Sequence, residues 1–132
     1  MIQLSKALGI DKSVNFIGFR KDLNVILHQS DIFLYASEHE SFGNVMIEAG
    51  ASKLALVIPD NLITAKEIFS CDTDLVLYKS KDYIDLANHV NHIIQNNLIE
   101  NFQSRAYIAS QKFDKNIILE KYITIINNQI KD

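Results

Sequence analysis

The spacing of apolar residues divides the chain into two parts. As far as residue 78, short apolar runs alternate with polar turn residues, which is typical of strands joined by short helices. From residue 83 onward, apolar residues recur every three or four positions, which indicates one face of a helix. The pattern predicts an α/β fold, with a Rossmann-like parallel sheet layered between helices and a helical C-terminal tail.

Turn and capping residues define the individual elements. An opening helix over 2–8 is expected to end at Gly9, Asp22 is a good N-cap for a short helix, and Thr64 can cap another over 65–69. The apolar runs predict strands over 14–18, 32–36, 54–58 and 74–78. A helix is expected after Gly43, extending to about residue 52. Apolar stripes predict three more helices, over 83–94, 98–109 and 119–130.

The first strand of such a sheet is not found at the start of the sequence. A doubly wound sheet normally begins with a strand and its ligand-contacting loop, and here neither precedes the opening helix. We therefore expect one domain, residues 1–132, that is incomplete at its N-terminus. The missing strand would leave an exposed sheet edge or apolar patch, which favours self-association.

Composition narrows the class of protein. With 48% hydrophobic and 22% charged residues, the chain is ordinary for a globular domain, and its net charge of −3 without a long basic run argues against a nucleic-acid partner. The single Cys71 excludes an internal disulfide and suits a reducing compartment. No apolar run reaches the roughly 20 residues that span a bilayer, and the N-terminus lacks a secretory signal pattern. We expect a cytoplasmic location, and peripheral association with the inner face of the membrane stays open.

Two carboxylates, Glu40 and Glu48, lie eight residues apart across a turn that contains Gly43 and opens a helix. A helix start offers unpaired N–H groups to an anion, and glycine lets a phosphate come close to the backbone. These amides belong to Phe42, Gly43, Asn44 and Val45. Glu48 lies about 6 Å further along the helix than Asn44, where a carboxylate can accept hydrogen bonds from the diol of a ribose. Glu40 precedes the turn, on the side of a donor sugar, so the pattern predicts a nucleotide-sugar site.

The segment 37–49, Ser-Glu-His-Glu-Ser-Phe-Gly-Asn-Val-Met-Ile-Glu-Ala, resembles the E-x7-E motif of the retaining, GT-B-fold glycosyltransferases of family 4. Residues 15–18 resemble the strand that leads to the base pocket of that family. Residues 65–68 are similar to its Pro-Glu-Val segment, and residues 104–122 to its closing helices. The likeness covers nearly the whole chain, as the later part of the family's C-terminal donor-binding domain.

The resemblance implies a nucleoside-diphosphate sugar as substrate, transfer with retention, and no bound metal or cofactor. It assigns Glu48 to the donor ribose and Glu40, the catalytic position, to the transferred sugar. In such enzymes the leaving diphosphate assists the incoming hydroxyl, so neither carboxylate needs to be a nucleophile. The amides after Glu40, namely those of Ser41, Phe42, Gly43, Asn44 and Val45, would hold the diphosphate and sugar, with His39 as a further donor contact. Phe19 and Arg20, which follow Gly18, would line the base pocket.

Several family features are absent or changed. The cations that neutralise the diphosphate lie upstream of the start of this chain, as does the acceptor-binding domain. Ser41 replaces a frequent glycine, Asn44 a frequent leucine, and residues 52–55 the usual Cys-Gly-Thr-Pro. We expect the chain to need an N-terminal acceptor-binding domain or a partner chain, and to be inactive or nearly so by itself.

The sequence is interpreted as the donor-binding portion of a retaining, hexosyltransferase-type glycosyltransferase in cell-surface polysaccharide or glycolipid synthesis. A non-catalytic nucleotide-sugar-binding subunit and a truncated, inactive fragment stay open as alternatives. A flavodoxin-like signalling module would need an acidic cluster near its first strand, which this sequence lacks. His89 and His92 lie one helical turn apart without a third ligand nearby, so a solvated face is favoured over a metal site.

Overall fold

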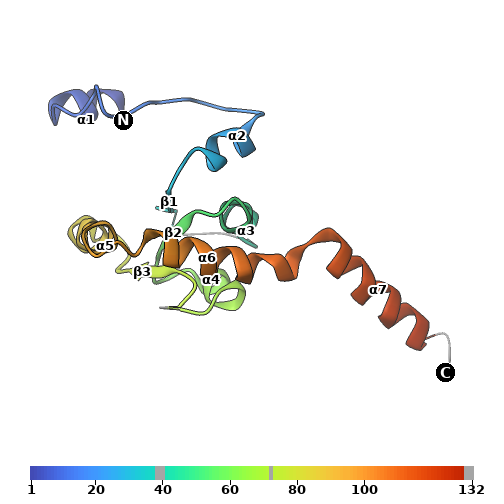
Figure 1. Ribbon diagram of the computed structural model, residues 1–132. Helices are drawn as coiled ribbons and strands as arrows, with labels where there is room; N and C mark the ends of the chain where they lie inside the picture. The colour runs from blue at the N-terminus through green and yellow to red at the C-terminus, as the bar shows by residue number, and fades with distance from the viewer. Residues whose placement is uncertain (38–40, 72, 130–132) are drawn as a thin grey trace.

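The computed structural model describes residues 1–37, 41–71 and 73–129. A small parallel sheet lies at the centre of the body, surrounded by helices (Figure 1). The strands are β1 (Ile32–Leu34), β2 (Ala55–Pro59) and β3 (Val76–Tyr78). The helices are α1 (Ile2–Ala7), α2 (Leu23–His28), α3 (Asn44–Ala51), α4 (Ile63–Ile68), α5 (Tyr83–Gln95), α6 (Ile99–Ser110), the 3-10 turn η1 (Gln111–Phe113) and α7 (Lys115–Gln129). This arrangement confirms the expected α/β class with a helical C-terminal region.

Strand β2 is the centre of the sheet. It pairs in parallel with β1 on one side and with β3 on the other, so that Val57 lies opposite both Leu34 and Val76. All five of its residues are buried, as expected for a strand that is covered on both faces. The apolar run predicted at 54–58 is therefore confirmed with a shift of one residue.

The side chains of β2 alternate between two apolar clusters. Leu56 and Ile58 belong to a cluster with residues of α3, α4 and α6, whereas Val57 belongs to a second cluster with Ile93 of α5. Because successive residues of a strand point to opposite faces, this alternation places helices on both faces of the sheet. The layered architecture predicted from the sequence is thus confirmed in the packing.

Helices α3 and α6 approach each other closely at Gly50. A Cβ atom added to Gly50 would lie 3.0 Å from the carbonyl oxygen of Ala106 and 3.4 Å from the Cβ of Ser110. Gly50 is therefore required by the contact between the helices, and the contact fixes α3 against the body. The position of α3 matters because its first turn carries the predicted anion site.

The N-terminal arm, residues 1–22, differs from the expectation. Helix α1 lies away from the sheet in Figure 1, joined to α2 by an extended segment. The strand predicted at 14–18 is wrong, because these residues take no part in the sheet of the described chain. Val14, Phe16 and Ile17 expose 38–43% of their surface, so this apolar run has no neighbour to pair with.

The C-terminal helices are found close to their predicted positions. Asp82 accepts hydrogen bonds from the amides of Ile84 and Asp85 and so caps α5. Helix α6 packs on α3 and β2, and α7 extends beyond the body (Figure 1). Across 1–37, 41–71 and 73–129, no helix combines the length and apolar character needed to cross a membrane.

Candidate functional site

The carboxyl ends of the three strands lie at one edge of the sheet, because all of them are parallel. In open α/β sheets, ligands bind outside this edge. The connection from β1 to α3 begins here with Tyr35, whose amide continues the ladder by donating to the carbonyl of Val57 at 3.0 Å. The connections that follow β2 and β3 begin at the same edge, at Asp60 and Lys79. This edge therefore carries the candidate site.

Gly43 forms the start of α3, as the sequence predicts. Its φ of +89° is in the left-handed region, where a side chain would be strained, and its carbonyl accepts the amide of Met46 at 2.9 Å. A glycine at the N-cap has no side chain to occupy the helix start. The amides of Asn44 and Val45, the first two residues of the helix, thus meet no capping side chain from that position.

Glu48 lies on the exposed face of α3. Met46, Ala49 and Gly50 are buried on the opposite face, whereas Asn44 and Glu48 are exposed one turn apart. Among the residues that the structure describes, none forms a hydrogen bond or ion pair with the Glu48 carboxylate. The side chain is therefore accessible to a ligand, and it shares a face with the helix start.

The other predicted residues near the helix start have different surroundings. Val45 is half-buried against the core, so only its backbone remains for a ligand. Phe42 is 53% exposed and meets the ring of Phe113 edge-on, with 6.3 Å between the ring centroids. Ser41 is exposed. Glu40 and His39, the predicted catalytic and donor contacts, lie outside the described residues.

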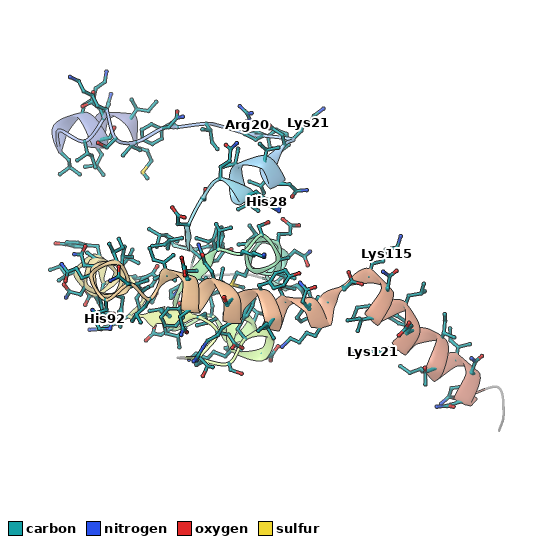
Figure 2. All side chains as sticks on the ribbon, in the orientation of Figure 1. Arg20, Lys21, His28, His92, Lys115 and Lys121 are labelled. Atoms are coloured by element: carbon teal, nitrogen blue, oxygen red, sulfur yellow. The ribbon has the colours of Figure 1, made fainter. Side chains whose placement is uncertain are left out.

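The predicted base-pocket residues lie in the N-terminal arm. Gly18 has a φ of +62° in open space, and Phe19 is 90% exposed. Figure 2 shows Arg20 beyond α2, on the side away from the sheet. The structure therefore leaves these residues apart from the start of α3.

Arg20 is engaged with a carboxylate close by in the sequence. Its guanidinium donates two hydrogen bonds to Asp22, of 2.8 and 2.5 Å. The bonds from Arg20 hold the pKa of the Asp22 carboxyl below its usual value, and the pKa of Arg20 is raised in turn. Asp22 occupies the N-cap of α2 by position, but its side chain makes no capping hydrogen bond. The N-cap position predicted for Asp22 is therefore confirmed, but without a capping hydrogen bond from its side chain.

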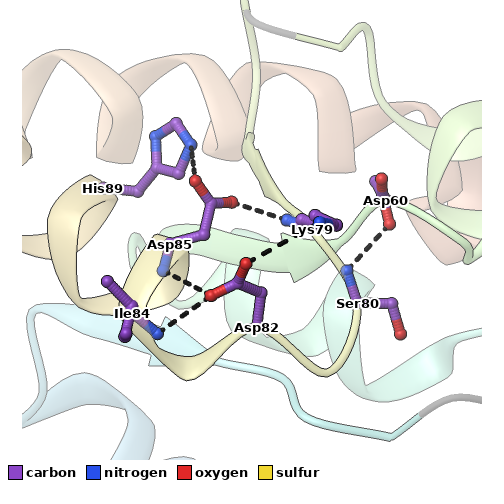
Figure 3. A network of polar contacts seen from close by, with 7 residues as sticks. All are labelled: Asp60, Lys79, Ser80, Asp82, Ile84, Asp85 and His89. Atoms are coloured by element: carbon purple, nitrogen blue, oxygen red, sulfur yellow. Dashed lines mark hydrogen bonds and ion pairs between the residues drawn. The ribbon is translucent and has the colours of Figure 1, made fainter.

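A polar network that the sequence did not reveal fixes the edge beyond β3 (Figure 3). Asp60, which follows β2, accepts the amide of Ser80 at 3.0 Å, and its own amide donates to the carbonyl of Tyr78 at 2.8 Å. Asp85 accepts the amide of Lys79 at 2.7 Å. The sequence could not predict these hydrogen bonds, because the bonds join residues up to 20 positions apart and the aspartates follow no recognisable spacing.

Thr64 was expected to cap α4 but lies inside it. The residue at the N-cap position is Leu62, which offers no side-chain hydrogen bond. The Thr64 hydroxyl is buried and has no hydrogen-bond partner among the described residues.

Two curated relatives from Campylobacter jejuni are similar to this chain. N,N'-diacetylbacillosaminyl-diphospho-undecaprenol alpha-1,3-N-acetylgalactosaminyltransferase is 27% identical over 121 residues, which are 91% of this chain and 32% of the relative. N-acetylgalactosamine-N,N'-diacetylbacillosaminyl-diphospho-undecaprenol 4-alpha-N-acetylgalactosaminyltransferase is 24% identical over 116 residues, or 87% of this chain and 32% of the relative. The chain thus spans about a third of the length of these relatives.

Solved structures share the fold, and a family model matches most of the sequence. HepE of Anabaena, in complex with UDP and glucose, superposes with a TM-score of 0.82 at 27% identity over 96% of this chain and 35% of HepE. The C-terminal domain of LpcC, a glycosyl transferase group 1 family protein from Francisella tularensis, gives a TM-score of 0.72 at 30% identity over 83% of this chain and 58% of that domain. The model of the family "Glycosyl transferases group 1" matches residues 1–113. The chain therefore belongs to the group 1 glycosyl transferases.

Proposed function

We propose that this chain is the donor-binding portion of a glycosyltransferase that takes a sugar from a nucleoside-diphosphate sugar and transfers it with retention. The observation that carries the proposal is the family match over residues 1–113, which includes the helix start at Gly43. HepE, which shares the fold, is in complex with UDP and, in another structure, with UDP-glucose. A donor of this class presents the diphosphate that a helix start can bind.

The roles within the site follow from the order of the groups in the donor. The amides from Phe42 to Val45 bind the diphosphate, and Glu48 on the exposed face of α3 binds the ribose. Glu40 contacts the transferred sugar, with His39 and Ser41 beside it. Gly18, Phe19 and Arg20 line the base pocket, which requires the N-terminal arm to move toward α3 or to be packed there by a further domain.

The proposed setting is the synthesis of a cell-surface polysaccharide or glycolipid. Both curated relatives are named for transfer of N-acetylgalactosamine to a sugar carried on diphospho-undecaprenol. We propose a cytoplasmic protein that works at the inner face of the membrane. A metal ion is not required in this scheme, because backbone amides and cations neutralise the diphosphate.

The proposed reaction needs groups beyond those described. The relatives are about three times longer, and we propose that an acceptor-binding domain, in the same polypeptide or in a partner, supplies the acceptor site. Each hydrogen-bond donor that stabilises a leaving diphosphate contributes about 3–4 kcal/mol in comparable sites. The 132 residues alone are therefore expected to bind a donor without transferring its sugar at an appreciable rate.

Calorimetric titration with UDP, GDP and ADP tests the donor site. We expect one nucleotide to bind better than the others, and Glu48→Ala to weaken its binding at least about tenfold, because a charge-assisted hydrogen bond contributes about 1.5–3 kcal/mol. Glu100→Ala is the matched control, since Glu100 is an exposed glutamate in the first turn of α6. Equal affinities of wild type and Glu48→Ala would remove the ribose assignment, and no binding of any nucleotide would remove the donor site.

A further inference from the structure

We infer that Tyr78 and Phe113 are positioning residues, which fix the two described flanks of the connection between β1 and α3. The inference rests on the proposed function, because this connection leads into the amides that would bind the diphosphate. Neither residue belongs to the segment 37–49 that resembles the E-x7-E motif, although Phe113 lies in the stretch 104–122 that is similar to the family's closing helices. Tyr78 lies 43 residues from the residue that it holds.

Tyr78 holds the first flank through a partly buried hydrogen bond. Its hydroxyl donates to the carbonyl of Tyr35 at 3.0 Å, and only 5% of Tyr78 is exposed. Strands β1 and β3 both pair with β2, so they lie two strand spacings, about 10 Å, apart. The tyrosine side chain bridges this gap. Since the amide of Tyr35 donates to Val57, the residue that begins the connection is fixed at both its N–H and its carbonyl.

The bridging residue is itself held in place from the side of β2. The carbonyl of Tyr78 accepts the amide of Asp60 at 2.8 Å. The two residues that follow Tyr78 donate their amides to Asp85 and Asp60, as Figure 3 shows for Lys79 and Ser80. The backbone that bears the Tyr78 hydroxyl is therefore already fixed by these hydrogen bonds. The bond from Tyr78 to Tyr35 consequently restrains the position of Tyr35.

Phe113 holds the second flank. The ring of Phe42, one residue before Gly43, meets it edge-on, which is a favourable geometry for two aromatic rings. The ammonium group of Lys112 lies over the Phe113 ring, 5.4 Å from its centroid, and also donates to the carbonyl of Ile68. Phe113 is thus tied to the end of α4, and through Phe42 it restrains the residue that leads into the helix start.

Fixing both flanks lowers the entropy that ligand binding has to remove. Ligand affinity falls when binding has to order the groups that contact the ligand, and it rises when those groups are already held in the conformation that binds. The effect of one neutral hydrogen bond corresponds to roughly a fivefold change in an equilibrium. Tyr78→Phe removes the hydroxyl and keeps the ring, so the core around the ring stays filled.

Hydrogen exchange tests the restraint without any ligand. In Tyr78→Phe we expect the amide of Tyr35 to exchange roughly fivefold faster, while the amides of Ile58 and Val76, which lie in the ladder between β2 and β3, keep their rates. Tyr83→Phe is the control, because Tyr83 is 79% exposed. An unchanged exchange rate at Tyr35 would overturn the inference. An equal rise at all three amides would overturn it too, because that result reports a loss of global stability and no local restraint of Tyr35.

Nucleotide affinity tests the functional half of the inference. With UDP as the probe, we expect Tyr78→Phe and Phe113→Leu each to weaken binding about three- to tenfold. The Phe113 variant is compared with Phe102→Leu, a half-buried aromatic of the same helical region that packs on the other apolar cluster. Unchanged UDP affinity together with faster exchange would assign Tyr78 a structural role alone. If the wild type binds no nucleotide, the proposed function fails, and the exchange rates still decide whether Tyr78 restrains Tyr35.

Discussion

The central strand and the N-terminal arm contain similar apolar runs but fold differently. The apolar run at 54–58 forms β2 (Ala55–Pro59), which is buried on both faces, whereas residues 14–18 remain an exposed extended segment. Both runs would satisfy a sequence criterion for a strand. The difference lies in the neighbours: β2 has a paired strand on either side and helices above and below. An apolar run becomes a strand only where its hydrogen bonds and both faces find partners.

The largest expected contrast is in the free energy of unfolding. Leu56→Ala opens a cavity in the sheet core, where Leu56 is completely buried, and is expected to cost about 3–4 kcal/mol. Phe16→Ala in the arm removes a larger side chain but is expected to cost less than about 1 kcal/mol, because Phe16 is 43% exposed. Urea denaturation compares the two variants. Similar losses would mean that the arm is packed in solution.

Two glycines give the next contrast. Gly50→Val is expected to cost about 2–3 kcal/mol, because the side chain would meet the backbone carbonyl of Ala106. Gly9→Ala in the arm meets no atom within 4 Å, and only its φ of +69° opposes the change, at about 1 kcal/mol. Thermal unfolding by circular dichroism measures both. A lower melting temperature for the Gly9 variant than for the Gly50 variant would contradict the helix contact.

Self-association is the third test of the arm. Phe19, 90% exposed, and its apolar neighbours form a surface of the kind that proteins normally cover. We expect the chain to self-associate at high concentration, and Phe19→Ser to weaken the association about tenfold through lost apolar burial. Sedimentation velocity provides the measurement, with Tyr122→Ser on α7 as the control. A monomer at all concentrations would show that the exposed arm does not drive association.

The smallest expected effect is electrostatic. The pKa of Asp22 is lowered by its hydrogen bonds from Arg20, so the pair stabilises the start of α2 above the ordinary aspartate value of about 3.9 and loses that effect as the pH falls through the lowered value. The pair is exposed and its effect on stability is therefore slight. An NMR titration of Asp22 should give a pKa that rises toward the ordinary value in Arg20→Gln, because Arg20 is the largest cause of the lowering. An unchanged pKa in that variant would exclude the ion pair in solution.

The sequence predicted much of the site as well as the fold. Gly43 was expected to open a helix because a glycine follows a strand and precedes an apolar helical stripe, and α3 begins at the next residue. Glu48 was expected on an accessible face, and it is exposed. Asp22 lies at the N-cap of α2 as predicted, but its carboxylate binds Arg20 and makes no capping hydrogen bond. Thr64 was wrong as a cap, because α4 begins before it, with Leu62 at the N-cap. The roles of Glu40 and of Gly18, Phe19 and Arg20 stay predictions.

The local sequence pattern determined the alternation of strands and helices, the start of α3 and the position of Glu48 on the exposed face of that helix. These features depend on residues within one or two turns of each other, and periodicity records such contacts directly. Tertiary structure alone decided that residues 14–18 stay unpaired, that Gly50 serves a helix contact, and that Tyr78 reaches Tyr35 across β2. Those outcomes depend on which distant segments become neighbours, and a single sequence does not encode that proximity in any local pattern.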